Sequence, residues 1–239
     1  MNQKPNILII VTDQMTWKAL PAYGNTYCKT PNIDRIAARG VRFDKAYTPF
    51  PLCQPARAAF WTGLYPHQTG VLSNGRKHFV PPLPENIPTL GSLFAESGYD
   101  TVHFGKTHDA GSLRGFRIEP ENELAVEGTT AWPVAKDTFR DRYTTVKAVN
   151  YLQKHRGKPY LVVADLVNPH DICQWIGKNK GAHEDIPIQG ELPPLPDNFE
   201  FGDIENRPAS VQYICCSHNR QAQAAGWNEL NYRHYLAAY

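Results

Sequence analysis

Cys53 and Arg57 form the first pair of residues whose types and spacing could support chemistry, within Pro51–Gly63 (PLCQPARAAFWTG). The stretch Pro55–Thr62 is expected to form a helix that ends at Gly63, with Cys53 just before its first turn. The N–H groups and positive end of that helix would attract an anion, and Arg57, one turn from Cys53, could bind the same anion. On helix chemistry alone, however, a buried cysteine near a helix cap is the more common arrangement.

Further polar residues follow two apolar, β-branched runs. Asp13 and Gln14 follow the run Asn6–Thr12, and Asn168–Asp171 (NPHD) follows the run Tyr160–Val167. Such runs are typical of strands buried on both faces of a parallel sheet, and open α/β sheets bind ligands beyond the carboxyl ends of their strands. The Asp13 carboxylate suits Ca²⁺ or Mg²⁺, and the Gln14 carbonyl could bind the same ion. The alternative for Asp13 is an aspartate in a turn, and the alternative for Gln14 is an ordinary polar loop residue.

The elements expected to position these residues alternate between strands and helices. Strands are expected at 6–12, 41–47, 99–104 and 160–167, and helices at 30–40, 55–62, 89–97, 137–155 and from about 227 onward. This alternation predicts a doubly wound α/β sheet, with the functional site where the strand ends converge. The chain from residue 171 to 208 is rich in Pro, Gly and acidic residues and is expected to form a long surface loop.

The composition of the 239-residue chain excludes several classes of protein. With 41% hydrophobic and 20% charged residues, the chain is globular rather than disordered or fibrous. A net charge of +2 without a dense Lys/Arg block argues against nucleic-acid binding, and no apolar run approaches the roughly 20 residues of a membrane span. Five cysteines without a CxxC pair argue against a disulfide scaffold. The N-terminus has no signal-peptide pattern, which predicts a cytoplasmic protein, or a periplasmic or secreted one if a signal was removed.

The order Cys53-x-Pro55-x-Arg57, followed by Thr62-Gly63, resembles the signature of the type I sulfatases in the alkaline phosphatase superfamily. Further segments resemble that family in the same order along the chain, namely residues 5–14, 30–47, 63–71, 103–108 and 168–171. The resemblance implies an α/β fold of the alkaline phosphatase type, a sandwich with a mixed, mostly parallel central sheet between helices. It also implies hydrolysis of a sulfate monoester carried by a small molecule or a carbohydrate.

The resemblance implies roles for particular residues as well. Cys53 would be oxidised to formylglycine by a formylglycine-generating or sulfatase-maturating enzyme, and the hydrated aldehyde would be the nucleophile. The implied catalytic residues are Cys53, Arg57, Lys106, His108 and His170, the sulfate contacts are Asn74, Lys106 and His170, and the ligands of Ca²⁺ or Mg²⁺ are Asp13, Gln14 and Cys53. Lys106 and His108 would point the same way in an extended segment, whereas His103 is expected to be structural. The ordinary alternatives are a helix-face salt bridge for Arg57, a solvated loop pair for Lys106 and His108, a turn for Asn74 and a structural histidine for His170.

Members of that family are typically about twice as long as this chain, and a later strand ending in Asp-Asn or Asp-His completes their metal site. No such pair follows Tyr160, since Asp165 lies inside the expected strand and Asp203 in a loop. Residues 1–239 are therefore interpreted as the N-terminal portion of a sulfatase catalytic domain, truncated before the metal-binding half and the C-terminal subdomain, and inactive alone. The alternatives are a phosphonate or phosphate ester hydrolase of the same superfamily, and a truncated chain that only binds anions or a partner. Residues 111–132 and 172–206 are expected to select the substrate.

Overall fold

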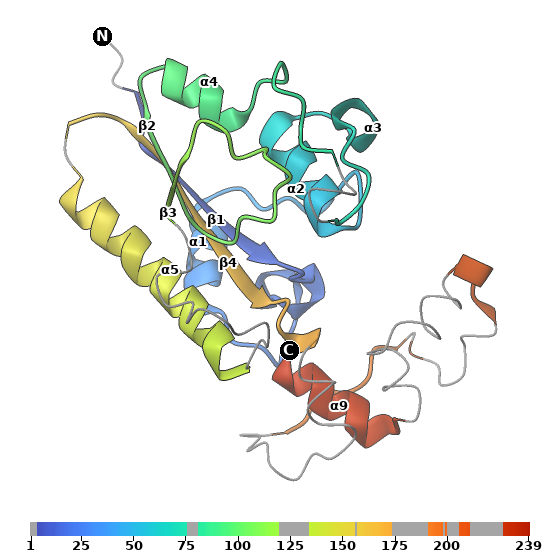
Figure 1. Cartoon of the computed structure of the whole chain (residues 1–239). Helices are drawn as coiled ribbons and strands as arrows, with labels where there is room; N and C mark the ends of the chain where they lie inside the picture. The colour runs from blue at the N-terminus through green and yellow to red at the C-terminus, as the bar shows by residue number, and fades with distance from the viewer. Residues whose placement is uncertain are drawn as a thin grey trace. The chain divides into compact units, whose positions relative to one another are not determined.

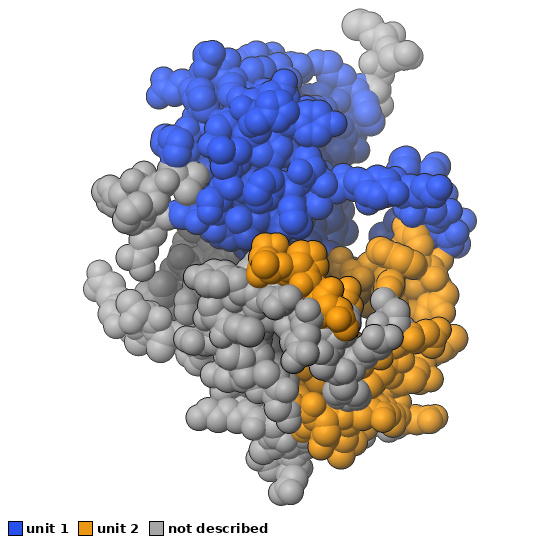
Figure 2. Space-filling view, turned by 90° about the vertical axis from the view of Figure 1, so that its right-hand side faces the viewer, with its two compact units in different colours: residues 1–13, 35–167 blue, residues 14–34, 168–239 orange. Residues whose placement is uncertain are grey.

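The computed structural model describes residues 4–75, 81–119, 134–155, 157–173, 191–197, 199, 206–210 and 227–239. The chain divides into two compact units (Figure 2), the first with residues 1–13 and 35–167 and the second with residues 14–34 and 168–239. The loops expected to select the substrate, and the long loop expected up to residue 208, lie largely outside the described residues. Among the described helices, none is both long and apolar enough to cross a membrane.

The described part of the chain mixes strands and helices, with several helices between the first two strands and two strands in direct succession before the next helix (Figure 1). The strands are β1 (Ile7–Asp13), β2 (Asp100–Gly105), β3 (Arg117–Glu119) and β4 (Tyr160–Pro169). The helices are α1 (Pro31–Arg39), α2 (Cys53–Thr62), α3 (Pro66–Thr69), α4 (Leu90–Glu96), α5 (Val134–Lys154) and α9 (Glu229–Ala238), with 3-10 turns η1 (Trp17–Ala19) and η2 (Pro21–Tyr23). The sequence does not predict β3, because three residues are too few to display a period of two.

The four described strands form one sheet in the order β1-β4-β2-β3. β2 is parallel to both β3 and β4, which confirms the parallel sheet expected from the alternation of elements. In the register of β2 and β4, His103 lies opposite Val163 and Gly105 lies opposite Asp165. The carboxyl end of β2 therefore lies beside a charged residue of β4.

The first unit has an apolar cluster on each face of this sheet. The cluster under α2 and α4 contains Trp61, Leu113, Phe116, Leu161 and Val163. The cluster under α5 contains Val102, Phe104, Ala148, Val162 and Ala164. Figure 1 shows α5 on one side of the sheet and α2 and α4 on the other. Alternate residues of a strand point to opposite faces, so burial of both faces explains why most residues of β4 are apolar.

The strand expected at residues 41–47 is wrong. Within the described residues this segment pairs with no strand, and Val41, Phe43 and Tyr47 are 80%, 72% and 86% exposed. An alternating pattern indicates which side chains can share a face, but a strand also needs a neighbour with unpaired backbone groups. The pattern in this segment is therefore compatible with an extended chain outside the described sheet.

Gly105 is required where β2 ends, and replacing it should destabilise the first unit. Gly105 has φ 99°, and a Cβ atom there would overlap the carbonyl oxygen of Asp165. We expect Gly105→Ala to lower the free energy of unfolding by roughly 2 kcal/mol or more, because it combines strain in φ with a steric clash. Urea unfolding followed by circular dichroism measures the loss.

Gly157 provides the matched control, since it has the same φ of 99° but a Cβ atom added there would have no heavy atom within 4 Å. Gly157→Ala should therefore cost only the strain in φ, about 1 kcal/mol. Equal losses for the two variants would contradict the role assigned to the close approach at Gly105.

Candidate active site

Cys53 and Asp13 lie at the ends of two elements of the first unit. Cys53 is the first residue of α2 and Asp13 is the last residue of β1, and both side chains are partly buried. A carboxylate oxygen of Asp13 lies within 4.8 Å of Cys53 Sγ. α2 begins two residues earlier than expected and ends at Gly63, which adopts a left-handed φ of 71° as a helix stop requires. The structure thus brings the expected nucleophile and one expected metal ligand together.

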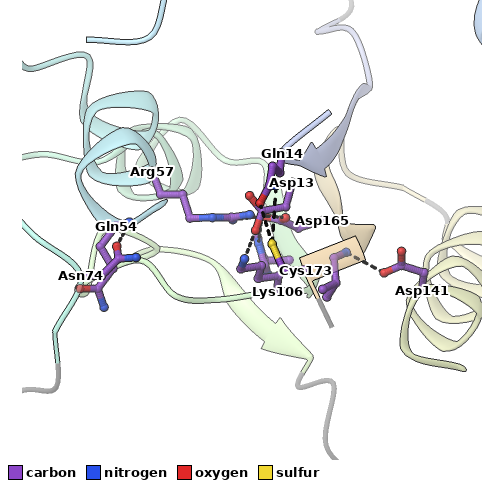
Figure 3. A network of polar contacts seen from close by, with 11 residues as sticks. Asp13, Gln14, Gln54, Arg57, Asn74, Lys106, Asp141, Asp165 and Cys173 are labelled. Carbon is purple, nitrogen blue, oxygen red and sulfur yellow. Dashed lines mark hydrogen bonds and ion pairs between the residues drawn. The ribbon is translucent and has the colours of Figure 1, made fainter. Parts of the chain in front are cut away.

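Arg57 lies one turn into α2 and forms a buried ion pair with Asp165 of β4 (Figure 3). The Arg57 Nη1 and Nη2 groups donate to the two carboxylate oxygens of Asp165, at 2.5 and 3.0 Å. The carboxylate is also 3.3 Å from Nε2 of His103, and both Asp165 and His103 are 0% exposed. Arg57 therefore reaches the neighbourhood of Cys53 with its guanidinium plane already fixed by a carboxylate.

Lys106 follows β2 directly and forms an ion pair with Asp13. Its backbone N–H donates to the carbonyl oxygen of Asp165 at 2.9 Å, so the turn after Gly105 is tied to β4. The Lys106 side chain is buried, as is that of Arg57. The site therefore holds two cations, each beside a carboxylate, and these four charges balance one another.

His108 differs from Lys106 in its environment. Lys106 and His108 would point the same way in an extended segment, and His108 departs from that conformation with a φ of 26°. His108 is exposed, whereas Lys106 is buried. Protonation of a leaving group by His108 stays a prediction.

Asn74 caps the helix that carries Cys53. The first residue before α2, Leu52, supplies no side-chain cap, and Asn74 Oδ1 instead accepts a hydrogen bond from the backbone N–H of Gln54 at 2.9 Å. The Gln54 side chain completes the link, since its Oε1 accepts from Gly75 N at 2.9 Å and its Nε2 donates to Gly75 O at 3.4 Å. The turn at residues 73–75 is thereby fastened to the start of α2 (Figure 3). A contact of Asn74 with sulfate stays a prediction beside this structural role.

Gln14 and His170 belong to the second unit. Gln14 is exposed with φ 65°, and its side-chain amide contacts Cys173 Sγ at 3.7 Å. The Tyr239 hydroxyl accepts from the backbone N–H of Thr16 at 2.8 Å and donates to the Gln14 carbonyl at 2.6 Å. Burial raises the pKa of Tyr239, so the phenol stays protonated and able to donate. His170 directly follows β4 and is partly buried, and the roles expected for Gln14 and His170 stay predictions.

A cavity of about 800 Å³ opens beside Cys53 in the first unit. Asp13, Cys53 and Arg57 form polar parts of its wall, and Phe60 and Trp61 form apolar parts. The cavity gives the cysteine and the arginine access to a ligand. The Asp13 carboxylate already attracts one cation, the Lys106 ammonium, and so fits a divalent metal ion in charge. An oxygen ligand at position 53 would suit Ca²⁺ or Mg²⁺, whereas a thiolate would suit softer metals.

Sequence reasoning missed Asp165 as a partner of the site. It placed Asp165 inside a strand and His103 among structural residues. The structure confirms that Asp165 lies within β4, and it places His103 in β2 with its side chain buried. The available signal is a carboxylate within the apolar run YLVVADLV, because a buried carboxylate requires a partner. No pattern in the sequence identifies Arg57 as that partner, since the two residues are 108 positions apart.

Comparison with known proteins relates the whole described site to one family. A family model described as Sulfatase matches residues 5–194. The chain is 54% identical over 238 residues to a delta 4,5-hexuronate-2-O-sulfatase of Bacteroides thetaiotaomicron, an alignment that covers 99% of this chain and 49% of that protein. The chain therefore spans about half the length of the curated relative.

Solved structures agree with this comparison. A 2-O GAG sulfatase superposes with a TM-score of 0.86 at 53% identity, over 99% of this chain and 50% of that chain. The phosphonate monoester hydrolase of Agrobacterium radiobacter superposes with a TM-score of 0.71 at 20% identity, over 98% of this chain and 55% of that chain. At that identity the second likeness indicates a shared fold alone.

The cap formed by Asn74 predicts a measurable effect on stability. We expect Asn74→Ala to lower the free energy of unfolding by about 1 kcal/mol, because the Gln54 N–H loses its acceptor. Asn74→Asp should restore most of this loss, since a carboxylate at the start of a helix accepts the same bond and interacts favourably with the helix dipole. Urea unfolding of both variants measures the difference.

Ser73→Ala is the matched control, because Ser73 is exposed and lies in the same turn, and its hydroxyl bonds only the carbonyl of Asn74 among the described contacts, at 3.3 Å. It should leave stability nearly unchanged. If Asn74→Ala has the same midpoint urea concentration of unfolding as the wild-type protein, the capping role is refuted.

Proposed function

The chain belongs to the sulfatase family of the alkaline phosphatase superfamily, and on that premise we propose that it forms the nucleophile-bearing part of a sulfuric ester hydrolase. The observation that carries the proposal is the approach of the Asp13 carboxylate to Cys53 Sγ, within 4.8 Å. Lys106 is paired with Asp13, and Arg57 lies one helical turn from Cys53 in the same cavity wall. These groups support binding of a tetrahedral anion next to a nucleophile.

The charges of the site suit the difficulty of the reaction. A sulfate monoester resists hydrolysis because the nucleophile must approach an anionic centre, so positive groups near the sulfate oxygens lower the barrier. Arg57 and Lys106 would donate charge-assisted hydrogen bonds to those oxygens, with Asn74 and His170 as further contacts. His108 would donate a proton to the departing oxygen of the alcohol.

Two groups that the family implies complete the proposal. We assign Cys53 to conversion into formylglycine by a maturating enzyme, which would supply a hydroxyl nucleophile in place of the thiol. Asp13, Gln14 and the converted Cys53 would hold Ca²⁺ or Mg²⁺, and the ion would offset negative charge at the reacting sulfate. Arg57 would hold the converted side chain in place, because it lies one turn along the same helix.

The substrate that we propose is a carbohydrate with a 2-O-sulfated, unsaturated hexuronate. The basis is the 54% identity, along nearly the whole chain, to a protein named as a delta 4,5-hexuronate-2-O-sulfatase. The solved structure described as a 2-O GAG sulfatase supports the same position of the sulfate. A phosphonate ester remains the alternative substrate, favoured only by the shared fold of the phosphonate monoester hydrolase.

Removal of Cys53 should abolish sulfate release. In the protein expressed from its complete gene together with a maturating enzyme, we expect Cys53→Ala to lower kcat by at least about 10³-fold, because the variant has no nucleophile. Ion chromatography of released sulfate measures the loss. Peptide mass spectrometry gives an independent readout, a decrease of about 18 Da at Cys53 in the active protein.

Cys28→Ala is the control for this experiment, since Cys28 is another partly buried free cysteine and lies in the second unit. Cys28→Ala should keep wild-type turnover and leave the mass change at Cys53 intact. Turnover by Cys53→Ala close to that of the control would contradict the proposed nucleophile.

A substrate series tests the proposed specificity. We expect kcat/KM for a 2-O-sulfated unsaturated hexuronate disaccharide to exceed that for a 6-O-sulfated N-acetylglucosamine or an aryl phosphonate monoester by about 10²-fold or more. The saturated 2-O-sulfated hexuronate is the closest control, because it keeps the position of the sulfate and lacks the ring double bond. Preference for the phosphonate would replace the sulfatase proposal by the alternative, and preference for the 6-O-sulfate would overturn the substrate while keeping the reaction.

A further inference from the structure

Asp165 is an unusual residue for its position in β4. It is 0% exposed within a strand in which Leu161, Val162 and Val163 are 0–1% exposed. Burying a carboxylate and a guanidinium costs several kcal/mol of desolvation, and apolar residues of similar size are often equally stable or more stable. Stability alone is therefore a weak reason for this ion pair, and its geometry calls for another explanation.

The geometry fixes the orientation of Arg57. Both carboxylate oxygens of Asp165 accept N–H groups of one guanidinium, at 2.5 and 3.0 Å, so the plane of the guanidinium cannot rotate without breaking a bond. Asp165 is held by the sheet, where it lies opposite Gly105, and its carbonyl accepts the Lys106 N–H. Arg57 also lines the cavity beside Cys53, so its orientation in the cavity wall is set from a rigid support.

His103 supports the carboxylate from the neighbouring strand. Its Nε2 lies 3.3 Å from Oδ2 of Asp165, and its ring packs edge-on against Trp61 and Phe116. In the described part of the chain, its buried Nδ1 has no hydrogen-bond partner, so Nε2 is the ring nitrogen that faces a polar group. A proton on Nε2 would donate to the Asp165 carboxylate, which accepts from Arg57 as well.

We propose that Asp165, supported by His103, is a positioning residue that aims the Arg57 guanidinium at the anion bound beside Cys53. The inference rests on the proposed function, in which Arg57 binds the sulfate group. It assigns no contact with substrate to Asp165 or His103. The competing explanation is that Asp165 only neutralises Arg57 and joins α2 to the sheet, with no effect on how the guanidinium meets the anion.

The two explanations predict opposite changes in anion binding. Asp165→Asn removes a negative charge near the site, so an electrostatic or anchoring role predicts sulfate binding that is unchanged or tighter. A positioning role predicts weaker binding despite the added net positive charge, because the guanidinium loses one strong acceptor and its fixed plane. We expect the Kd of inorganic sulfate, measured by calorimetry on the protein from its complete gene, to rise about ten-fold.

A double-mutant cycle tests whether Asp165 affects sulfate binding through Arg57. If Asp165 acts through Arg57, Asp165→Asn should weaken sulfate binding in the wild-type background and have no effect in an Arg57→Ala background. Additive effects in the two backgrounds would overturn the proposal. Asp100→Asn is the matched control, because Asp100 is a hydrogen-bonded carboxylate on β2, the strand that carries His103. Asp100 accepts from the Tyr151 hydroxyl at 2.6 Å and lies 3.5 Å from Nδ1 of His155. It should leave the Kd of sulfate unchanged.

His103→Phe supplies a second variant if circular dichroism shows that Asp165→Asn folds poorly. It keeps an aromatic ring against Trp61 and Phe116 and removes only the bond to Asp165. We expect a three- to ten-fold rise in the Kd of sulfate, again absent with Arg57→Ala, and an unchanged Kd in a folded variant would refute the support by His103.

Turnover separates this inference from the proposed function. If the wild-type protein hydrolyses a sulfate ester and the Kd of inorganic sulfate is unaltered in Asp165→Asn, the positioning role is overturned and the proposed function stands. Sulfate binding that depends on Asp165 only through Arg57, without hydrolysis of any sulfate ester, would overturn the function and leave the positioning role standing.

Discussion

The buried ion pair between Arg57 and Asp165 is the constraint on which the arrangement of the site depends. It joins α2, which carries Cys53, to β4 in the middle of the sheet. Because a charge pair of this kind loses most of its value when one partner is displaced, it tolerates little sliding of the helix along the sheet. Trp61, one turn further along α2, packs into the apolar cluster of the same face and holds the helix at a second point. The position of Cys53 is therefore fixed through its own helix.

Most of the fold could be predicted because its signals are local. The apolar runs at β1 and β4, the Thr89 cap of α4 and the stop at Gly63 each depend on a few neighbouring residues. The strand expected at residues 41–47 failed for the complementary reason. Its alternating pattern is genuine, but pairing depends on which strand lies beside it, and a local pattern carries no information on that neighbour.

The site was predictable to the extent that its residues belong to a linear motif or end a strand. Cys53, Arg57 and Asp13 are of this kind, and the structure places all three in the wall of one cavity. Asp165 belongs to neither class, since only the register of β2 and β4 and the direction of α2 reveal its partner. Asn74 was recognised as important by position, but its hydrogen bond to the start of α2 depends on the path of the intervening chain.

The contact between Asn74 and Gln54 also bears on the order in which the site can assemble. It closes a loop of 20 residues, whereas the bond between Arg57 and Asp165 closes one of 108. Loop-closure entropy grows with the length of the loop, so contacts near in sequence are the cheaper ones to form first. The start of α2, which carries Cys53, can thus be capped by a single contiguous stretch of chain. The orientation of Arg57, by contrast, requires the docking of β4, because its carboxylate partner belongs to that strand.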